Sequence, residues 1–183
     1  MRIIAGEKRG LRLNSPIGRD VRPTKDNVKE AVFGSIQFSI QGASFLDLFS
    51  GTGGIGIEAL SRGASFVCFA DNSRESLGVV NKNIESAGYT DDALVMCGDY
   101  STVIVKLSGK YRFDYVYIDP PYSASLYHDV LNCISENDIL NKDAVIILES
   151  DEELFPSFSK FEIIKKKRYG KCHITYMRFI DNE

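Results

Sequence analysis

The sequence predicts an α/β fold in which a mostly parallel β-sheet carries helices on both faces. From residue 45 onward, short apolar runs alternate with segments in which apolar residues recur at helical spacing. Such alternation is typical of parallel strands joined by helices. The last two apolar runs have no room for a helix between them, so they should end the chain as an antiparallel hairpin.

The start of the chain indicates a hairpin followed by a helix. The stretch RIIAGEKRGLRL places two short apolar segments, residues 2–5 and 11–13, around a charged centre that contains glycine. Pro23 holds Arg22 extended, because a proline disfavours helical geometry in the residue before it. Thr24 is a plausible N-cap for a helix that should run to about residue 38.

The middle of the chain supplies most of the sheet. Gly63 and Gly88 should end the first two helices of this region. His128 lies about 200° around the third helix from Val130, so it should face solvent. The expected strands are FLDLF, FVCFAD, ALVMCGD, FDYVYIDPP, AVIILES, FEIIKKKRY and CHITYMRF, and the expected helices are GIEALSRG, SRESLGVVNKNIESAG and SLYHDVLNCI.

Length and composition fit one globular domain with a short extension. The chain has 183 residues, 44% hydrophobic and 26% charged, which is ordinary for a globular protein with a sizeable core. We expect a basic extension at residues 1–40 and the main domain at residues 41–183. No apolar run approaches the roughly 18 residues of a membrane helix, and the N-terminus does not have the pattern of a signal peptide. A cytoplasmic protein without a membrane partner is therefore expected.

Cysteine and histidine do not form a metal-binding pattern. Cys68, Cys97, Cys133 and Cys172 are widely spaced, and each sits among apolar neighbours. We expect four buried, reduced thiols. The two histidines are far apart and have no acidic or cysteine cluster beside them, so no metal is expected.

Positive charge is concentrated in two segments although the net charge is −3. Residues 1–30 carry eight lysines and arginines against four acids, and KKKRYGK at residues 165–171 is a second basic stretch. A basic arm on an acidic body suggests a polyanionic partner, and a solvated surface explains the same charges. The candidate contacts are Arg2, Lys8, Arg9, Arg12, Arg22, Lys165, Lys166, Lys167 and Arg168.

A glycine-rich turn between a strand and a helix predicts a ligand site. Gly51, Gly53 and Gly56 have the G-x-G-x-x-G spacing that allows a tight turn and a close approach of backbone N–H groups to a ligand. Asp71 ends the second strand, where its carboxylate can bind ribose hydroxyls. Asp99 ends the third strand, where its carboxylate could accept an adenine amino group.

The acid within the first strand indicates which nucleoside is bound. Asp47 lies four residues before Gly51. A pyrophosphate favours a bare helix N-terminus with no anion nearby. An acid at this position better suits a ligand with a cationic ammonium group and no phosphate, such as S-adenosylmethionine. Each acid alone could be a solvated strand end or a helix cap, but that interpretation fits the whole set poorly.

The fourth strand brings Asp119, Pro120, Pro121 and Tyr122 to the same edge of the sheet. Proline fixes its φ angle, so the Pro120 carbonyl is held beside the Asp119 carboxylate and gives two acceptors for one NH₂ group. With Tyr122 stacked on a nucleobase, this pair would direct the lone pair of an exocyclic amine at a sulfonium methyl group. The released proton would go to Asp119 or to water. A proline-stiffened loop with a capping acid is the alternative.

The combined motifs resemble a known family. DLFSGTGGIGIEALSRGA, Asp71, Asp99 and DPPY resemble a Rossmann-like class I S-adenosylmethionine-dependent methyltransferase that acts on an exocyclic amine. RIIAGEKRGLRL, RPTKDNVKEAVF and DPPY, in this order, are similar to the RsmD family of 16S rRNA guanine-N2 methyltransferases over nearly the whole chain. Tyr122 departs from the phenylalanine that is common in the family, and either ring can stack on a base.

The resemblance implies a fold, a substrate and a set of site residues. It implies a seven-stranded sheet with the last strand antiparallel, and a guanine in the small ribosomal subunit as the target. No metal is expected from the cysteine and histidine spacing, and we expect a monomer. The catalytic residues would be Asp119, Pro120, Pro121 and Tyr122, and the cofactor-binding residues would be Asp47, Leu48, Phe49, Ser50, Gly51, Thr52, Gly53, Asp71, Asn72, Asp99 and Tyr100. The basic residues named above would hold phosphates of the RNA.

Three other functions share part of this pattern. A DNA adenine or cytosine amino-methyltransferase also uses D-P-P-Y, although such enzymes usually carry an added recognition domain. A non-catalytic RNA-binding or ribosome-assembly factor could keep the fold, although the intact motifs argue against it. A dinucleotide oxidoreductase would have no use for Asp47 or D-P-P-Y.

Overall fold

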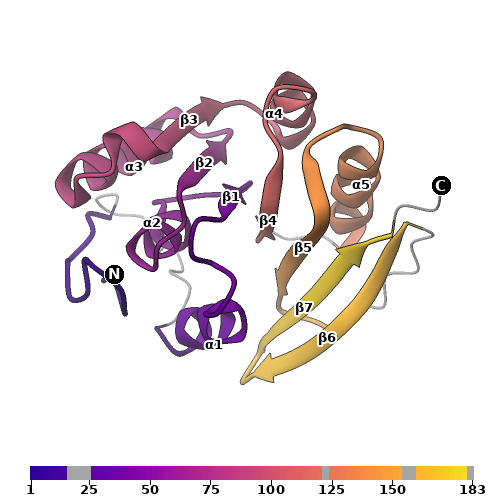
Figure 1. Ribbon diagram of the computed structural model, residues 1–183, viewed down its shortest axis with the longest axis horizontal. Coiled ribbons are helices and arrows are strands. Elements are labelled where there is room, and N and C mark those ends of the chain that lie inside the picture. Colours follow the sequence, from indigo (N-terminus) through magenta and orange to yellow (C-terminus); the bar gives the residue numbers. More distant parts are fainter. Residues whose placement is uncertain (16–25, 121–123, 154–159, 181–183) are drawn as a thin grey trace.

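The computed structural model describes residues 1–15, 26–120, 124–153 and 160–180. These residues form one seven-stranded sheet with the strand order β3-β2-β1-β4-β5-β7-β6 (Figure 1). The strands are β1 (Ser44–Asp47), β2 (Phe66–Asp71), β3 (Ala93–Cys97), β4 (Phe113–Ile118), β5 (Leu140–Ser150), β6 (Phe161–Tyr169) and β7 (Cys172–Phe179). The α-helices are α1 (Asp26–Ile36), α2 (Gly54–Ser61), α3 (Arg74–Ala87), α4 (Tyr100–Leu107) and α5 (Ala124–Ser135), with a short 3₁₀ turn, η1 (Thr90–Asp92).

The strand directions confirm the predicted fold. The first five strands pair in parallel, whereas β7 runs antiparallel to both β5 and β6. Two helix predictions need adjustment. The segment after Asp99, for which the sequence pattern predicted no helix, forms α4, and α1 ends at Ile36 instead of residue 38. The predicted N-cap Thr24 lies outside the described residues.

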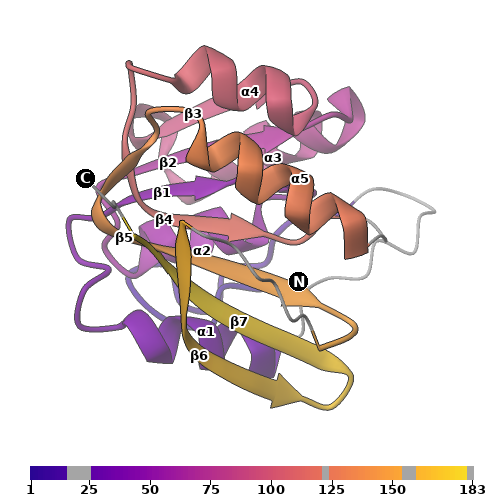
Figure 2. The same ribbon diagram turned by 90° about the vertical axis from the view of Figure 1, so that its right-hand side faces the viewer.

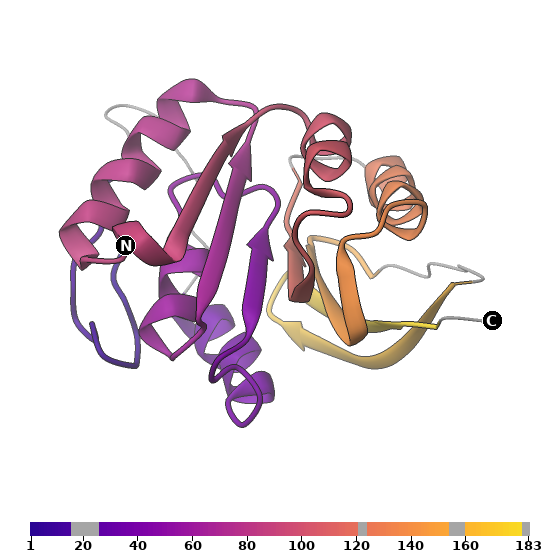
Figure 3. The same ribbon diagram turned by 45° about the horizontal axis from the view of Figure 1, so that its top comes forward.

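Helices cover both faces of the sheet (Figures 2 and 3). One core lies under α1, α2 and α3 and includes Phe45, Tyr115 and Tyr117. The other lies under α4 and α5 and includes Leu46 and Val116. Because successive strand residues point to opposite faces, the central strands are buried on both sides, which explains their nearly continuous apolar runs.

The N-terminal segment forms the predicted hairpin. Arg2 and Arg12 make an antiparallel bridge, and the Ile3 N–H donates to the Leu11 carbonyl at 2.9 Å. Gly6 lies in the turn at φ 84°, and a Cβ atom there would lie 1.8 Å from the Ser61 carbonyl oxygen of α2. Glycine at this position therefore allows the hairpin to lie directly on α2.

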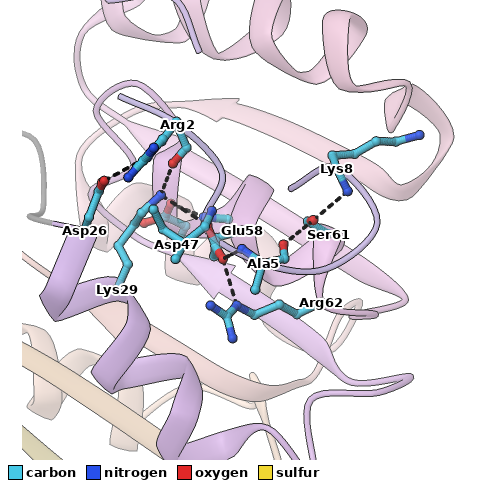
Figure 4. A network of polar contacts seen from close by, with 11 residues as sticks. Arg2, Ala5, Lys8, Asp26, Lys29, Asp47, Glu58, Ser61 and Arg62 are labelled. Carbon is cyan, nitrogen blue, oxygen red and sulfur yellow. Dashed lines mark hydrogen bonds and ion pairs between the residues drawn. The ribbon is translucent and has the colours of Figure 1, made fainter. Parts of the chain in front are cut away.

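A buried carboxylate joins the hairpin to the main domain (Figure 4). Glu58 of α2 is fully buried, and its carboxylate accepts hydrogen bonds from the Ile4 and Ala5 N–H groups at 2.8 and 3.0 Å. It also pairs with Lys29 of α1 at 3.2 Å and with Arg62 at 2.8 Å. The one side chain thus contacts the hairpin, α1 and its own helix.

Lys29 closes this network from the other side. Its ammonium is also fully buried and donates to the Arg2 carbonyl oxygen at 2.7 Å. Burial lowers the pKa of Lys29, while the neighbouring Glu58 carboxylate acts in the opposite direction. The described residues before position 41, 1–15 and 26–40, therefore share polar and apolar contacts with the main domain, and the domain boundary at residue 40 stays a prediction.

The cysteine prediction is correct in part. All four thiols are free; Cys68 and Cys172 are buried, and Cys133 is half-buried. The expectation of a buried thiol is wrong for Cys97, which is exposed because it ends the edge strand β3. His128 is exposed, as its helical position predicts. Among the helices in the described part of the chain, none is long and apolar enough to cross a membrane.

We predict that Glu58→Gln lowers the free energy of unfolding by about 3–5 kcal/mol, because it leaves Lys29 buried without a charged partner. The amide would also present donor hydrogens to backbone donors that now meet an acceptor. Urea unfolding of wild type and variant measures the difference. Glu85→Gln, an exposed acid on α3, is the control and should change stability by less than about 0.5 kcal/mol. An equal loss of unfolding free energy in the two variants would contradict the proposed contribution of the Glu58 network to stability.

Candidate functional site

Three predicted acids meet on one face of the sheet at the carboxyl ends of neighbouring strands. Asp47 at the end of β1 is in register with Phe69 of β2 and Tyr117 of β4. Asp71 and Asp119 lie two residues beyond those partners, so side-chain alternation puts all three acids on the face that α2 covers. In a parallel sheet this edge is where ligands bind.

The loop at residues 48–53 connects β1 to α2, and its glycines allow the tight turn that their spacing predicts. Gly51 and Gly53 have φ angles of 52° and 80°, in the left-handed region that favours glycine. Gly56 serves a different purpose, because a Cβ atom there would lie 2.2 Å from the Phe69 ring. Around Gly51, by contrast, the position of a Cβ atom has no neighbour within 4 Å among the described residues, so its open side can face a ligand.

Asp71 holds this loop against the end of β2. Its carboxylate accepts hydrogen bonds from the Gly51 N–H at 2.9 Å and from the Ser73 N–H at 2.8 Å. Each carboxylate oxygen can accept a second hydrogen bond, so a hydroxyl ligand can still bind Asp71. Asn72, the next residue, is exposed. The ribose-binding role of both residues stays a prediction.

Asp47, the last residue of β1, is a buried acid whose carboxylate contacts the first turn of α2. It is 2% exposed, and its Oδ2 atom accepts a hydrogen bond from the Gly56 N–H at 3.0 Å. Burial raises the pKa of Asp47 to about 7, and the negative charge of Asp71 acts in the same direction. A cationic group bound here would favour the ionised carboxylate, whereas a phosphate would be repelled.

The rest of the loop also has room for polar contacts. Within the described part of the chain, the buried Ser50 hydroxyl has no hydrogen-bond partner, so it is available to a ligand. Leu48 and Thr52 are buried, and their backbones anchor the loop. The Leu48 N–H donates to the Tyr117 carbonyl at 3.1 Å, and the Thr52 carbonyl accepts from the Asn83 amide at 3.0 Å. These residues fit an ammonium-bearing nucleoside.

Asp99 has a structural role beside its predicted one. It is the N-cap of α4 and accepts hydrogen bonds from the Thr102 N–H at 2.9 Å and the Ser101 hydroxyl at 2.6 Å. These bonds lower its pKa. Tyr100 follows it, and its ring lies 6.4 Å from that of Phe49, so the structure brings two predicted cofactor residues together. Adenine binding by Asp99 stays a prediction.

The D-P-P-Y motif is described in part. Asp119 follows β4 and is half-buried, and Pro120 is buried. Pro121 and Tyr122 lie outside the described residues, so the stacking prediction is not tested.

The two basic segments lie apart from each other. The hairpin packs beside α2 and α3, whereas β6 is the edge strand at the other end of the sheet (Figure 1). In the hairpin, Arg9 and Arg12 are exposed, while Arg2 pairs with Asp26 at 3.1 Å and Lys8 with Glu7 at 2.8 Å. Arg22 lies outside the described residues.

The basic residues of β6 divide between the two sides of the strand. Lys165 lies 3.5 Å from the Ser35 hydroxyl of α1, whereas Lys166 pairs with Glu153 at 3.3 Å. Lys167 and Arg168 complete the stretch, and Arg168 is in register with His173 of β7. Because His173 is in turn in register with Ser150 at the end of β5, this basic end of β6 is level with the edge that carries Asp119.

The sequence pattern did not reveal the roles of two buried polar residues. Asn83 of α3 is fully buried and bonds to both the glycine loop and Asn14 after the hairpin. Glu58 links the hairpin to α2. The available signal was a polar residue among apolar neighbours on one helix face, which does not by itself identify the partner.

A family model described as "Conserved hypothetical protein 95" matches residues 1–178. The chain belongs to this family. The chain is 34% identical to the putative rRNA methyltransferase YlbH of Bacillus subtilis, over 93% of this chain and 94% of that protein. It is 31% identical to the ribosomal RNA small subunit methyltransferase D of Haemophilus influenzae, over 84% of this chain and 80% of that protein. The predicted relationship to the RsmD family is confirmed.

The fold comparison agrees with the sequence comparison. The structure of the putative methyltransferase yhhF from Escherichia coli matches with a TM-score of 0.87 and 26% identity, over 98% of both chains. The chain therefore shares its overall fold with that protein.

We predict that Asp47→Asn stabilises the free protein at high pH. The folded-state pKa of Asp47 is about 7 against 3.8 for an ordinary aspartate, so the stability contributed by its bound proton is lost as the pH rises through 7. An asparagine has no such loss. At pH 8 the variant should be more stable by about 1 kcal/mol or more, since one pKa unit corresponds to about 1.4 kcal/mol.

Urea unfolding at pH 5.5 and pH 8 measures this effect, and the difference between variant and wild type should shrink at the lower pH. Asp129→Asn, at an exposed position of α5, is the matched control and should show no such trend. A stability difference for Asp47→Asn that does not change with pH would contradict the raised pKa.

Proposed function

We propose that the chain transfers a methyl group from S-adenosylmethionine to the exocyclic N2 amine of a guanine in 16S rRNA of the small ribosomal subunit. Curated relatives with 31–34% identity are named rRNA methyltransferases, which supports the reaction and the substrate class. The observation that carries the proposal is the joint presence of the buried Asp47 and the half-buried Asp119 at one edge of the sheet.

The residues around the glycine loop have the chemistry that this cofactor needs. Bound S-adenosylmethionine supplies an electrophilic methyl group on a sulfonium. Asp47, Ser50 and Gly51 would hold its methionine part, because they offer a buried carboxylate, a hydroxyl without a partner in the described structure, and an open glycine. Asp71 would bind the ribose hydroxyls, and the rings of Phe49 and Tyr100 would line the adenine side.

Asp119 and Pro120 would orient the amine. The Asp119 carboxylate and the Pro120 carbonyl each accept one hydrogen of the NH₂ group, so the nitrogen lone pair is free to attack. An exocyclic amine is a poor nucleophile because its lone pair is delocalised into the ring, and fixed acceptors reduce that delocalisation. Positioning and electrostatics therefore account for most of the catalysis. The proton leaves to Asp119 or to water.

RNA fits the remaining features better than DNA. A base must leave its stack to reach the site, and RNA loops offer bases that are already unstacked. Basic side chains of the hairpin and of β6 would contact phosphates, which fix register without reading sequence. Among the described residues before β1, 1–15 and 26–43, apolar contacts and hydrogen bonds to Glu58 join the segment to the main domain, which does not favour a separate DNA-recognition module.

Methyl transfer from labelled S-adenosylmethionine tests the proposal directly. Wild type should label small subunits that lack their own modification, and the labelled nucleoside should be N2-methylguanosine. Asp119→Ala should reduce the rate by at least about a hundredfold, because it removes an acceptor that acts on the reacting amine. Glu136→Gln, at an exposed position after α5, is the control. Cofactor binding by calorimetry should survive in Asp119→Ala.

The other outcomes separate the competing functions. Label in duplex DNA and not in subunits would assign a DNA amino-methyltransferase. Tight binding of cofactor and subunits without transfer by wild type would assign a non-catalytic assembly factor. Comparable transfer by wild type and Asp119→Ala would remove Asp119 from the mechanism.

Salt dependence of RNA binding tests the basic hairpin. Phosphate contacts release counterions, so affinity should fall steeply with salt. The triple variant Arg9→Gln, Arg12→Gln, Arg22→Gln should reduce the log–log slope by about 2–3, roughly one for each lost contact. A matched triple, Lys106→Gln, Lys110→Gln and Lys142→Gln, removes exposed cations away from the site and should keep the slope. An unchanged slope in the arginine variant would exclude the hairpin from RNA binding.

The monomeric state and the cytoplasmic location stay predictions.

A further inference from the structure

Glu149 lies beside Asp119 on the next strand of the sheet. Tyr117 pairs with Ile147 and Ile118 pairs with Leu148, so the residue after β4 is level with Glu149 of β5. Tyr117 and Ile147 belong to the same core, which puts Asp119 and Glu149 on the same face. Adjacent strands are about 4.8 Å apart, so one planar base can contact both carboxylates.

Buried donors fix the direction of the Glu149 carboxylate. Its Oε2 atom accepts a hydrogen bond from the Tyr117 hydroxyl, and its Oε1 atom lies 3.4 Å from the Cys172 thiol. Both donors are buried. Burial is the main reason that the pKa values of Tyr117 and Cys172 are raised, so both stay protonated at neutral pH. The Tyr127 hydroxyl of α5 also donates to the Glu149 backbone carbonyl at 2.5 Å.

This arrangement leaves the carboxylate able to bind a ligand. An ionised carboxylate has about four acceptor sites, and the two side-chain donors use two of them. Glu149 is half-exposed, unlike the donors beneath it. Within the described part of the chain, the remaining acceptor sites are therefore open to a ligand at the same edge as Asp119.

The group beside the amine of each base determines which base such a second acceptor would bind. Guanine presents an N1–H donor directly beside its N2 amine. Adenine and cytosine present a ring nitrogen acceptor beside their amines, which a carboxylate repels. An acid next to the amine-binding acid therefore favours guanine.

We propose that Glu149 is a specificity-determining residue that accepts the N1–H of the target guanine while Asp119 and Pro120 hold its N2 amine. The proposal rests on the proposed function. It assigns Tyr117 and Cys172 as positioning residues that orient Glu149. It also explains why this site, which carries a motif shared with adenine and cytosine methyltransferases, would reject those bases.

The test compares guanine with 2-aminopurine, which keeps the 2-amino group but has an acceptor in place of the N1–H donor. After the target nucleotide is mapped, small subunits are reconstituted from ligated 16S rRNA that carries either base at that position. Wild type should methylate guanine about ten- to a hundredfold faster than 2-aminopurine, the value of a hydrogen bond to a charged group. Glu149→Gln should lower the guanine rate and abolish this preference, because its amide can donate to the acceptor of 2-aminopurine.

Two further variants separate recognition from structure. Tyr117→Phe should reduce the preference part of the way, because it removes one donor that orients the carboxylate. Glu162→Gln, at an exposed position of β6, should leave it unchanged. Thermal unfolding confirms that each variant is folded.

The outcomes distinguish this inference from the function on which it rests. If Glu149→Gln slows both bases equally, Glu149 has only a structural role and the inference fails while guanine methylation stands. The inference also fails, and guanine methylation again stands, if wild type methylates both bases equally. No transfer to guanine by wild type would overturn the inference together with the proposed function.

Discussion

The carboxylate of Glu58 connects three parts of the chain that are distant in sequence. A buried carboxylate is costly unless cations and hydrogen-bond donors surround it. Here Lys29, Arg62 and two backbone N–H groups of the hairpin supply them. Lys29 is itself fully buried, so without Glu58 its ammonium would lose its buried charged partner. The hairpin, α1 and α2 therefore depend on one another for their positions, and α2 in turn follows the glycine loop.

At the sheet edge that carries Asp47 and Asp119, polar burial has the opposite effect, because it destabilises the free protein. Asp47 has only the Gly56 N–H as a described partner, and its raised pKa reflects a charge that the free protein does not fully compensate. A residue that destabilises the free protein and favours a cation is typical of a site shaped for binding instead of stability. Asp71 differs, because it bonds to two backbone N–H groups and so shapes the loop itself. The difference in burial and partners lets similar side chains serve different roles.

The sequence was sufficient to predict the fold and the meeting of Asp47, Asp71 and Asp119 at one edge of the sheet, because both depend on local patterns. Apolar runs, helix-ending glycines and acids at strand ends are all read within a few residues. The long-range partners of Glu58 and Asn83 could not be predicted, because these contacts join residues more than 25 positions apart. Asp99 shows a third case, since an acid that precedes a helix can cap it and bind a ligand, and the pattern does not separate the two.

The same limit explains why Glu149 was not identified from the sequence. The run AVIILES has an acid directly before its last residue, much as several other strands have an acid at their ends, and the motif signal lies entirely on the neighbouring D-P-P-Y strand. Only the pairing of β4 with β5 brings Glu149 level with Asp119, and only the fold of β7 brings Cys172 beneath it. A motif that grips an amine cannot by itself distinguish guanine from adenine or cytosine. In this fold Glu149 on the adjacent strand β5 would make that distinction, because its side chain would contact the ring nitrogen next to that amine.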